Sequence, residues 1–156
     1  LFDLNPSIQV YCNRGTSGID GSTSTAIGAA LVRSEQTVFI TGDLSFFYDS
    51  NALWNAYIPK NFRIILINNA GGGIFRFIEG PQSTDSLEYF ETPHGLRAEK
   101  LCELYHMSYF TAESQKELTE VLADFYAEGG HAKLLEVFTP REENDKVLKA
   151  YFKALK

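Results

Sequence analysis

Two short apolar runs, each followed by polar side chains, constrain the fold of this 156-residue chain more than any other feature. The first run covers residues 38–40 and leads into Gly42-Asp43, and the second covers residues 64–67 and leads into Asn68-Asn69. Short β-rich runs with a helical segment between them predict a βαβ unit in a parallel sheet. We therefore expect an α/β fold with three layers, α/β/α, around a mostly parallel sheet.

The ends of these two runs carry oxygen atoms suited to a hard metal ion. Ligands of open α/β sheets bind beyond the carboxyl ends of the strands, where Asp43 and Asn69 are expected. A carboxylate, an amide oxygen and a backbone carbonyl suit Mg²⁺, which prefers oxygen and completes its octahedron with water and substrate phosphates. The glycines of residues 71–73 allow close backbone approach, and helix N-termini offer N–H groups to phosphate. The pattern predicts a site for Mg²⁺ and a phosphorylated ligand.

The same residues resemble a known fingerprint. Gly42-Asp43 followed by Asn68-Asn69 is similar to the motif of the thiamin diphosphate-dependent enzymes. The resemblance implies the thiamin diphosphate-binding fold, with Mg²⁺ held by Asp43, Asn69 and the carbonyl of Gly71 and with the metal anchoring the cofactor's diphosphate. In the usual motif a glycine follows the aspartate, whereas in this chain Leu44 follows it. This difference reduces the number of subfamilies that the chain resembles.

Three segments resemble one branch of that family, the transferases of menaquinone biosynthesis: residues 14–21, 42–45 and 72–75. Members of this branch decarboxylate 2-oxoglutarate and add the succinyl-semialdehyde unit to isochorismate. The resemblance covers most of residues 8–80 and implies two groups of contacts. The substrates would be contacted by Arg14, Ile74, Phe75 and Ile78. The cofactor would be contacted by Ser17, Gly18, Ile19, Gly42, Leu44, Ser45 and Gly72.

Several of these residues also have a structural interpretation. Arg14 is either a surface or structural arginine or a clamp for a substrate carboxylate, which its planar donors suit. Ile74, Phe75 and Ile78 either line a substrate pocket or form a short helix packed on the sheet. The surrounding segment, residues 74–93, is long enough to indicate a functional loop, within which we expect Arg76 and Glu79 to be solvated.

One part of the family's machinery has no counterpart in this sequence. In the family a glutamate on a separate pyrimidine-binding domain, usually from the partner subunit, activates the cofactor. We therefore assign no catalytic residue to this chain. We expect residues 1–156 to form a single domain for diphosphate and Mg²⁺, the C-terminal fragment of a longer polypeptide that is inactive alone and works as a homodimer or tetramer.

Composition limits the partners. A net charge of −6 argues against nucleic acid, and no apolar run approaches the roughly 18 residues of a membrane span. Cys12 and Cys102 are expected to be reduced, as in a cytoplasmic protein. The histidines, at positions 94, 106 and 131, lack metal-ligand spacing and are expected to be structural or exposed.

Two other functions remain open. One is a thiamin diphosphate enzyme that acts on pyruvate, similar to acetolactate synthase. The other is a non-catalytic domain, which either binds a nucleotide through the glycines of residues 71–73 or serves assembly alone. Beyond the two runs, periodicity predicts further strands and helices. Strands are expected at 10–12, 107–110 and 132–138, and helices at 22–33, 46–57, 96–105, 114–126 and from 140 onward.

Overall fold

The computed structural model describes residues 4–155 apart from 14, 16–17, 79 and 84. Within these residues, one parallel sheet has the strand order β1-β2-β4-β3. Its strands are β1 (Thr37–Gly42), β2 (Phe62–Asn68), β3 (Ser108–Ala112) and β4 (Lys133–Phe138). The predicted parallel sheet is confirmed, and the two apolar runs form its neighbouring strands β1 and β2.

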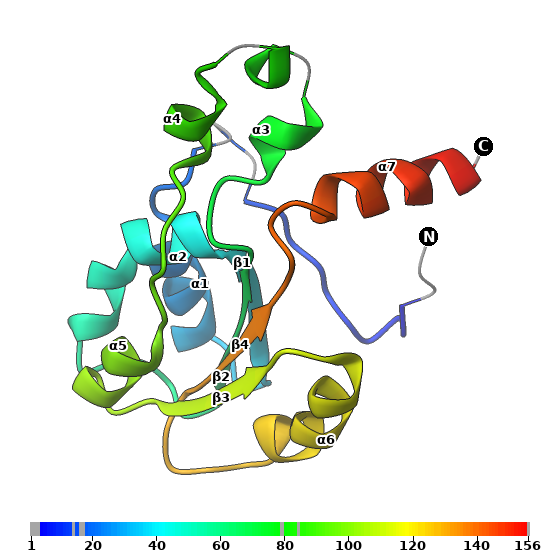
Figure 1. Ribbon diagram of the computed structural model, residues 1–156. Coiled ribbons are helices and arrows are strands. Elements are labelled where there is room, and N and C mark those ends of the chain that lie inside the picture. Colours follow the sequence, from blue (N-terminus) through cyan, green and yellow to red (C-terminus); the bar gives the residue numbers. More distant parts are fainter. Residues whose placement is uncertain (1–3, 14, 16–17, 79, 84, 156) are drawn as a thin grey trace.

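The helices either cover a face of the sheet or lie beyond its end, as Figure 1 shows. They are α1 (Ser22–Leu31), α2 (Asp43–Tyr48), the 3-10 helix η1 (Ser50–Trp54), α3 (Ile74–Phe77), the 3-10 helix η2 (Pro81–Ser83), α4 (Leu87–Glu91), α5 (Glu99–Leu104), α6 (Gln115–Tyr126) and α7 (Asn144–Ala154). Helices α1, α2 and α5 pack on one face and α6 packs on the other, which confirms the three-layer architecture.

The main core lies between the sheet and α1, α2 and α5. Alternate residues of β2 point into it, and Phe62, Ile64 and Leu66 are fully buried there. They meet Phe46 of α2 and Cys102 of α5. On the opposite face, α6 packs over β3 and β4 but leaves β1 uncovered, so that Ile40 remains 66% exposed.

Helix α6 is fixed at both ends. Its start is capped by Ser114, whose Oγ accepts a hydrogen bond from Glu117 N at 3.2 Å. At its other end, the buried Arg63 of β2 donates to the carbonyl oxygens of Phe125 and Ala127, each at 2.7 Å. Burial lowers the pKa of Arg63, and the carbonyl oxygens of a helix C-terminus are where a cation is stabilised.

Three local predictions were wrong. Residues 10–12 form no strand, because within the described chain nothing pairs with them. The helix expected over 46–57 is divided at Asp49 into α2 and η1. The last helix begins at Asn144 rather than at Pro140, and its apolar stripe, residues 147–155, lies largely exposed beside α3. No helix in the described ranges has the length and apolar character needed to span a membrane.

Candidate metal and diphosphate site

The carboxyl ends of β1 and β2 lie side by side and bring together residues that are distant in sequence. Asp43, 2% exposed, is the first residue of α2 directly after β1. Its Oδ1 accepts a hydrogen bond from Leu44 N at 2.8 Å, and its Oδ2 accepts one from Gly71 N at 2.9 Å. Asn69 lies in the same turn after β2. The structure therefore gathers the three predicted metal-binding residues at one edge of the sheet.

The glycine turn is packed too closely to admit side chains. A Cβ atom on Gly71 would lie 2.8 Å from the carbonyl oxygen of Glu91, and this oxygen also accepts a hydrogen bond from Gly72 N at 2.7 Å. A Cβ on Gly73 would lie 2.5 Å from Asn69 Nδ2. The turn thus needs glycine for its own packing, and its shape determines where the Gly71 carbonyl and the Asn69 side chain lie.

The two asparagines of the motif have different surroundings. Asn68 is buried, and its Nδ2 donates to Glu136 Oε1 at 2.7 Å and to Leu96 O at 3.0 Å, while its Oδ1 accepts from Ala70 N at 2.9 Å. These bonds hold Ala70 in the left-handed conformation, with φ of 59°, which is unfavourable for a residue with a Cβ. Asn68 therefore shapes the turn, while Asn69 carries the predicted ligand oxygen.

The support for Asn68 comes from a fully buried carboxylate that the sequence analysis missed. Besides Asn68, Glu136 of β4 accepts hydrogen bonds from Ala98 N, at 3.0 Å, and from the Tyr109 hydroxyl. Burial, together with this carboxylate, raises the pKa of Tyr109. The signal was present in the sequence, since residue 136 is a lone charge in the apolar run 134–138.

The segment 74–93 is tied down by a buried ion pair. Glu91, 1% exposed, accepts a hydrogen bond from Arg76 Nη2 at 2.9 Å and a second from Arg76 Nε, and Arg141 Nε lies 3.6 Å from the same carboxylate. The expectation that Arg76 is solvated is therefore wrong, because its side chain is only 19% exposed. Glu79 lies outside the described residues. Glu91 connects α3, α4 and the glycine turn, which places the segment against the site.

The predicted substrate residues that the structure describes belong to the segment directly after the glycine turn. The ring of Phe75 packs against that of Phe90, with centroids 5.4 Å apart, whereas Ile74 and Ile78 remain exposed at the surface. All three belong to α3 or directly follow it, so the short helix weighed as an alternative is present.

The described cofactor positions also converge here. Ser45 Oγ donates to the carbonyl oxygen of Ile19 at 2.9 Å, which connects α2 to the loop that contains Gly18. Leu44 lies beside Gly72, because its Cδ1 would be 3.3 Å from a Cβ placed there. Gly42 ends β1 next to Asp43. Arg14 and Ser17 lie outside the described residues.

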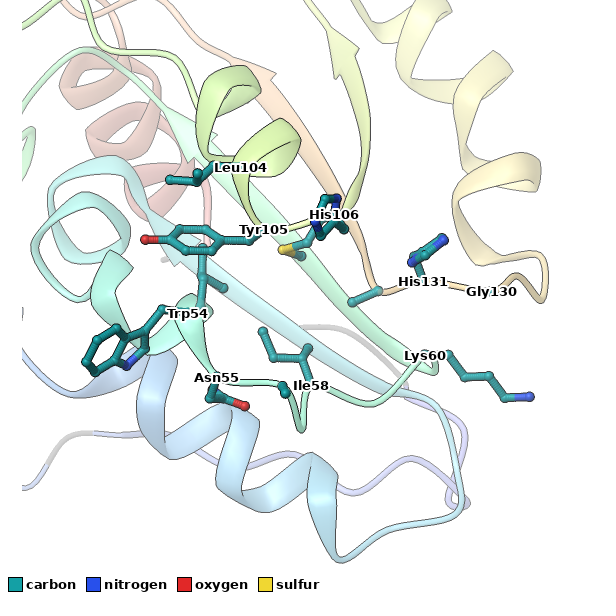
Figure 2. A pocket seen from close by; sticks show the side chains of 13 residues that line it. Trp54, Asn55, Ile58, Lys60, Leu104, Tyr105, His106, Gly130 and His131 are labelled. Atoms are coloured by element: carbon teal, nitrogen blue, oxygen red, sulfur yellow. The ribbon is translucent and has the colours of Figure 1, made fainter.

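Two hollows differ in their relation to the sheet. A cleft of about 230 Å³ opens beside Asn69 and is bordered by Arg97, Phe138 and Arg141. A larger one, of about 370 Å³, is lined by residues that precede β2, β3 and β4, among them His106 and His131 (Figure 2). Because α/β sheets bind ligands beyond the carboxyl ends of their strands, the smaller cleft is at the functional edge.

The donor set fits Mg²⁺ rather than zinc. In the described part of the chain, no cluster of three or more His, Cys, Asp or Glu side chains is placed to hold a metal. The edge instead provides one buried carboxylate, one amide and one backbone carbonyl, which is an all-oxygen set that leaves coordination positions for water and phosphate. Asp43 is already oriented by two backbone N–H groups, as a metal-binding carboxylate requires.

Known proteins resemble this chain in sequence and in fold. Residues 1–137 match the family model described as thiamine pyrophosphate enzyme, C-terminal TPP binding domain; thiamine pyrophosphate (TPP) is another name for thiamin diphosphate. The chain is 57% identical to 2-succinyl-5-enolpyruvyl-6-hydroxy-3-cyclohexene-1-carboxylate synthase of Christiangramia forsetii, over 100% of this chain and 27% of that protein. It is 59% identical to the synthase of the same name from Flavobacterium johnsoniae, over 99% and 28%.

A solved structure is similar in fold. The thiamine diphosphate-dependent 4-hydroxybenzoylformate decarboxylase of Rhodococcus jostii RHA1 superposes with a TM-score of 0.62 at 28% identity, over 74% of this chain and 22% of that one. The chain spans a little over a quarter of the length of the two synthases named above.

Proposed function

Because this chain belongs to the thiamine pyrophosphate enzymes, as their C-terminal TPP-binding domain, we propose that its β1–β2 edge holds Mg²⁺ and the cofactor's diphosphate. The metal ligands are Asp43, Asn69 and the carbonyl oxygen of Gly71. The observation that carries this proposal is the 2.9 Å hydrogen bond from Gly71 N to Asp43 Oδ2, because it joins two ligand-bearing strand ends into one site.

The proposed activity of the whole protein is a transferase reaction of menaquinone biosynthesis. It decarboxylates 2-oxoglutarate and transfers the succinyl-semialdehyde unit to isochorismate, in line with the names of the relatives. Thiamin diphosphate, when bound, supplies the electron sink for the decarboxylation. Residues 1–156 form the single diphosphate and Mg²⁺ domain, and the activating glutamate comes from another domain, so the isolated chain is inactive. The working form is a cytoplasmic homodimer or tetramer.

The residues of this chain bind and orient the reactants. Ile74 and Ile78 present apolar surface beside the glycine turn, where they contact the substrate, and Phe75 supports them from the packed side of α3. Ile19, Leu44 and Ser45 contact the cofactor from α2 and the loop before α1. Arg14 pairs with a substrate carboxylate, a role that its charge and planar donors suit because both substrates are anions.

The test measures binding and turnover in the protein at its natural length. We expect Mg²⁺-dependent binding of thiamin diphosphate by calorimetry and loss of isochorismate that requires 2-oxoglutarate. Asp43→Ala abolishes both, because it removes the only carboxylate of the donor set. Asp124→Ala is the matched control, since this exposed aspartate lies on α6, away from the site, and its substitution leaves both unchanged.

Two results would count against the proposal in different ways. Release of carbon dioxide from pyruvate, with no use of 2-oxoglutarate, would keep the cofactor site and replace the substrates. If Asp43→Ala still bound the cofactor fully and in a Mg²⁺-dependent way, the proposed metal site would be wrong.

A further inference from the structure

We propose that His94 is a positioning residue for the metal site, and that its Nε2–H holds Asp43 in the orientation in which it binds Mg²⁺. This inference rests on the proposed function of Asp43 as a metal ligand. It concerns a histidine that the sequence pattern did not connect with the site. His94 lies in the connection between α4 and α5, and its side chain is 11% exposed.

The position of the proton on the His94 ring follows from its neighbours. Nδ1 accepts a hydrogen bond from Leu96 N at 3.1 Å. A backbone N–H can only donate, so Nδ1 must present a lone pair to it. A neutral imidazole with an accepting Nδ1 carries its proton on Nε2. Nε2 is therefore an N–H donor and has no lone pair to offer a metal, which excludes His94 as a metal ligand while the Leu96 contact persists.

Asp43 Oδ2 is the acceptor next to Nε2. Nε2 is buried and lies 3.3 Å from this oxygen, without the alignment of a full hydrogen bond, and no other partner is found for it among the described residues. A buried N–H group without an acceptor is unfavourable and calls for an explanation. The adjacent carboxylate provides it, because Oδ2 lies 3.3 Å from Nε2 and a carboxylate oxygen can only accept.

The ring is held in this position from several directions. His94 N donates to Ala70 O at 3.2 Å, which fastens its backbone to the turn that carries the metal ligands. The ring meets that of Phe47 edge to face, with centroids 5.6 Å apart and an interplanar angle of 85°. Together with the Leu96 contact, these interactions leave little freedom for the ring to turn away from Asp43.

The consequence for Asp43 is an asymmetry between its two oxygens. Oδ2 faces two donors, Gly71 N and His94 Nε2, whereas Oδ1 accepts one hydrogen bond, from Leu44 N. Oδ1 therefore keeps the lone pair that is available to a cation, and His94 resists the rotation that would exchange the two oxygens. Donors of this kind around a metal-binding carboxylate typically change metal affinity by about 10–100-fold when they are removed.

The experiment compares two substitutions of similar size in the protein at its natural length. His94→Leu removes the N–H donor, and His94→Gln retains an N–H donor at the end of the side chain. Mg²⁺ is titrated in the presence of thiamin diphosphate by calorimetry, and a thermal melt in EDTA reports the folding of each metal-free variant. We expect about 10–100-fold weaker Mg²⁺ binding for His94→Leu and recovery of most of this loss in His94→Gln. His131→Leu, an exposed histidine at the opposite end of the sheet, is the control and binds as the parent does.

The outcomes separate this inference from the proposed function. If the parent protein binds no Mg²⁺ with thiamin diphosphate, the metal site itself is wrong. If the parent binds and His94→Leu binds equally well, the site stands and the role of His94 is refuted. Equal losses in His94→Leu and His94→Gln, in Mg²⁺ binding or in folding, also refute it, because the ring would then act by packing rather than by donating its N–H group.

Discussion

Replacing Asp43 by asparagine is expected to destabilise the fold even when no metal is present. Both carboxylate oxygens accept backbone hydrogen bonds, from Leu44 N at 2.8 Å and from Gly71 N at 2.9 Å. An amide has one accepting oxygen, so either orientation of asparagine places its NH₂ group against a backbone N–H. At least one hydrogen bond is lost, and two donors are left facing each other in a buried site.

The magnitude follows from the kind of bond that is lost. A hydrogen bond to a charged group contributes about 1.5–3 kcal/mol, and a buried donor left without an acceptor costs a similar amount. We therefore expect Asp43→Asn to lower the free energy of unfolding by about 2 kcal/mol. For a chain of this size such a change lowers Tm by about 4–8 °C.

The same substitution at Asp49 serves as a matched control. Asp49 is also buried, but among the described residues the hydrogen-bonding partners of its carboxylate belong to Ser24: the backbone N donates to Oδ2 at 2.8 Å and Oγ donates to both oxygens. Asparagine can keep its oxygen toward Ser24 N and donate its NH₂ group to the hydroxyl, which accepts as well as donates. Asp49→Asn should therefore lose much less stability than Asp43→Asn.

Thermal and urea unfolding followed by circular dichroism in excess EDTA compares the variants without any contribution from bound metal. Equal stability of Asp43→Asn and the parent would refute the reasoning, since the cost of burying the carboxylate would then offset its two hydrogen bonds. If Asp43→Asn and Asp49→Asn lost equal stability, the argument that the Ser24 hydroxyl can accept from an asparagine at position 49 would be refuted.

Four further predictions concern buried charges and thiols. Glu91→Ala removes the carboxylate between two arginines, so it should lower the free energy of unfolding by about 3–5 kcal/mol and speed proteolysis within residues 74–93. Glu113→Ala, which removes one partner of an exposed ion pair, should have neither effect. Arg63→Lys keeps the charge but loses the planar set of donors to the end of α6, and hydrogen exchange of α6 should accelerate. Burial raises the pKa of Cys102 to about 12 from the ordinary value of 9.0, so a thiol reagent at pH 8 should modify Cys12 but not Cys102 in the folded protein. Since the unfolded thiol ionises first, this raised pKa should also make stability fall between about pH 9 and pH 12, a decline that Cys102→Ala lacks in urea unfolding.

The sequence was sufficient to predict that the residues after β1 and β2 would meet at one edge of the sheet. Apolar runs define β1 and β2, and in a parallel sheet the residues that follow them must meet at one edge, which is why Asp43 and Gly71 were expected together. This part rests on local patterns and on one general property of parallel sheets, and it needs no knowledge of side-chain contacts.

The support around the ligands was not predictable in the same way. Glu136 acts on Asn68 across neighbouring strands, and Glu91 reaches the glycine turn only after residues 74–90 have folded back. The expected strand at 10–12 failed for a related reason, since a strand requires a neighbour and its sequence pattern does not state whether one is present. Arg14 and Ser17 lie outside the described residues, so their roles stay predictions.

The origin of the donors and of their supports bears on protein engineering. The three proposed ligands come from one short stretch, residues 43–71, whereas several of the groups that brace the turn, among them Glu91 and Glu136, come from later in the chain. Grafting that stretch onto another parallel sheet would transfer the coordinating atoms without Glu91, His94 and Glu136. Such a chimera would carry the motif but leave its turn free to move, so a successful transplant must include residues up to the end of β4.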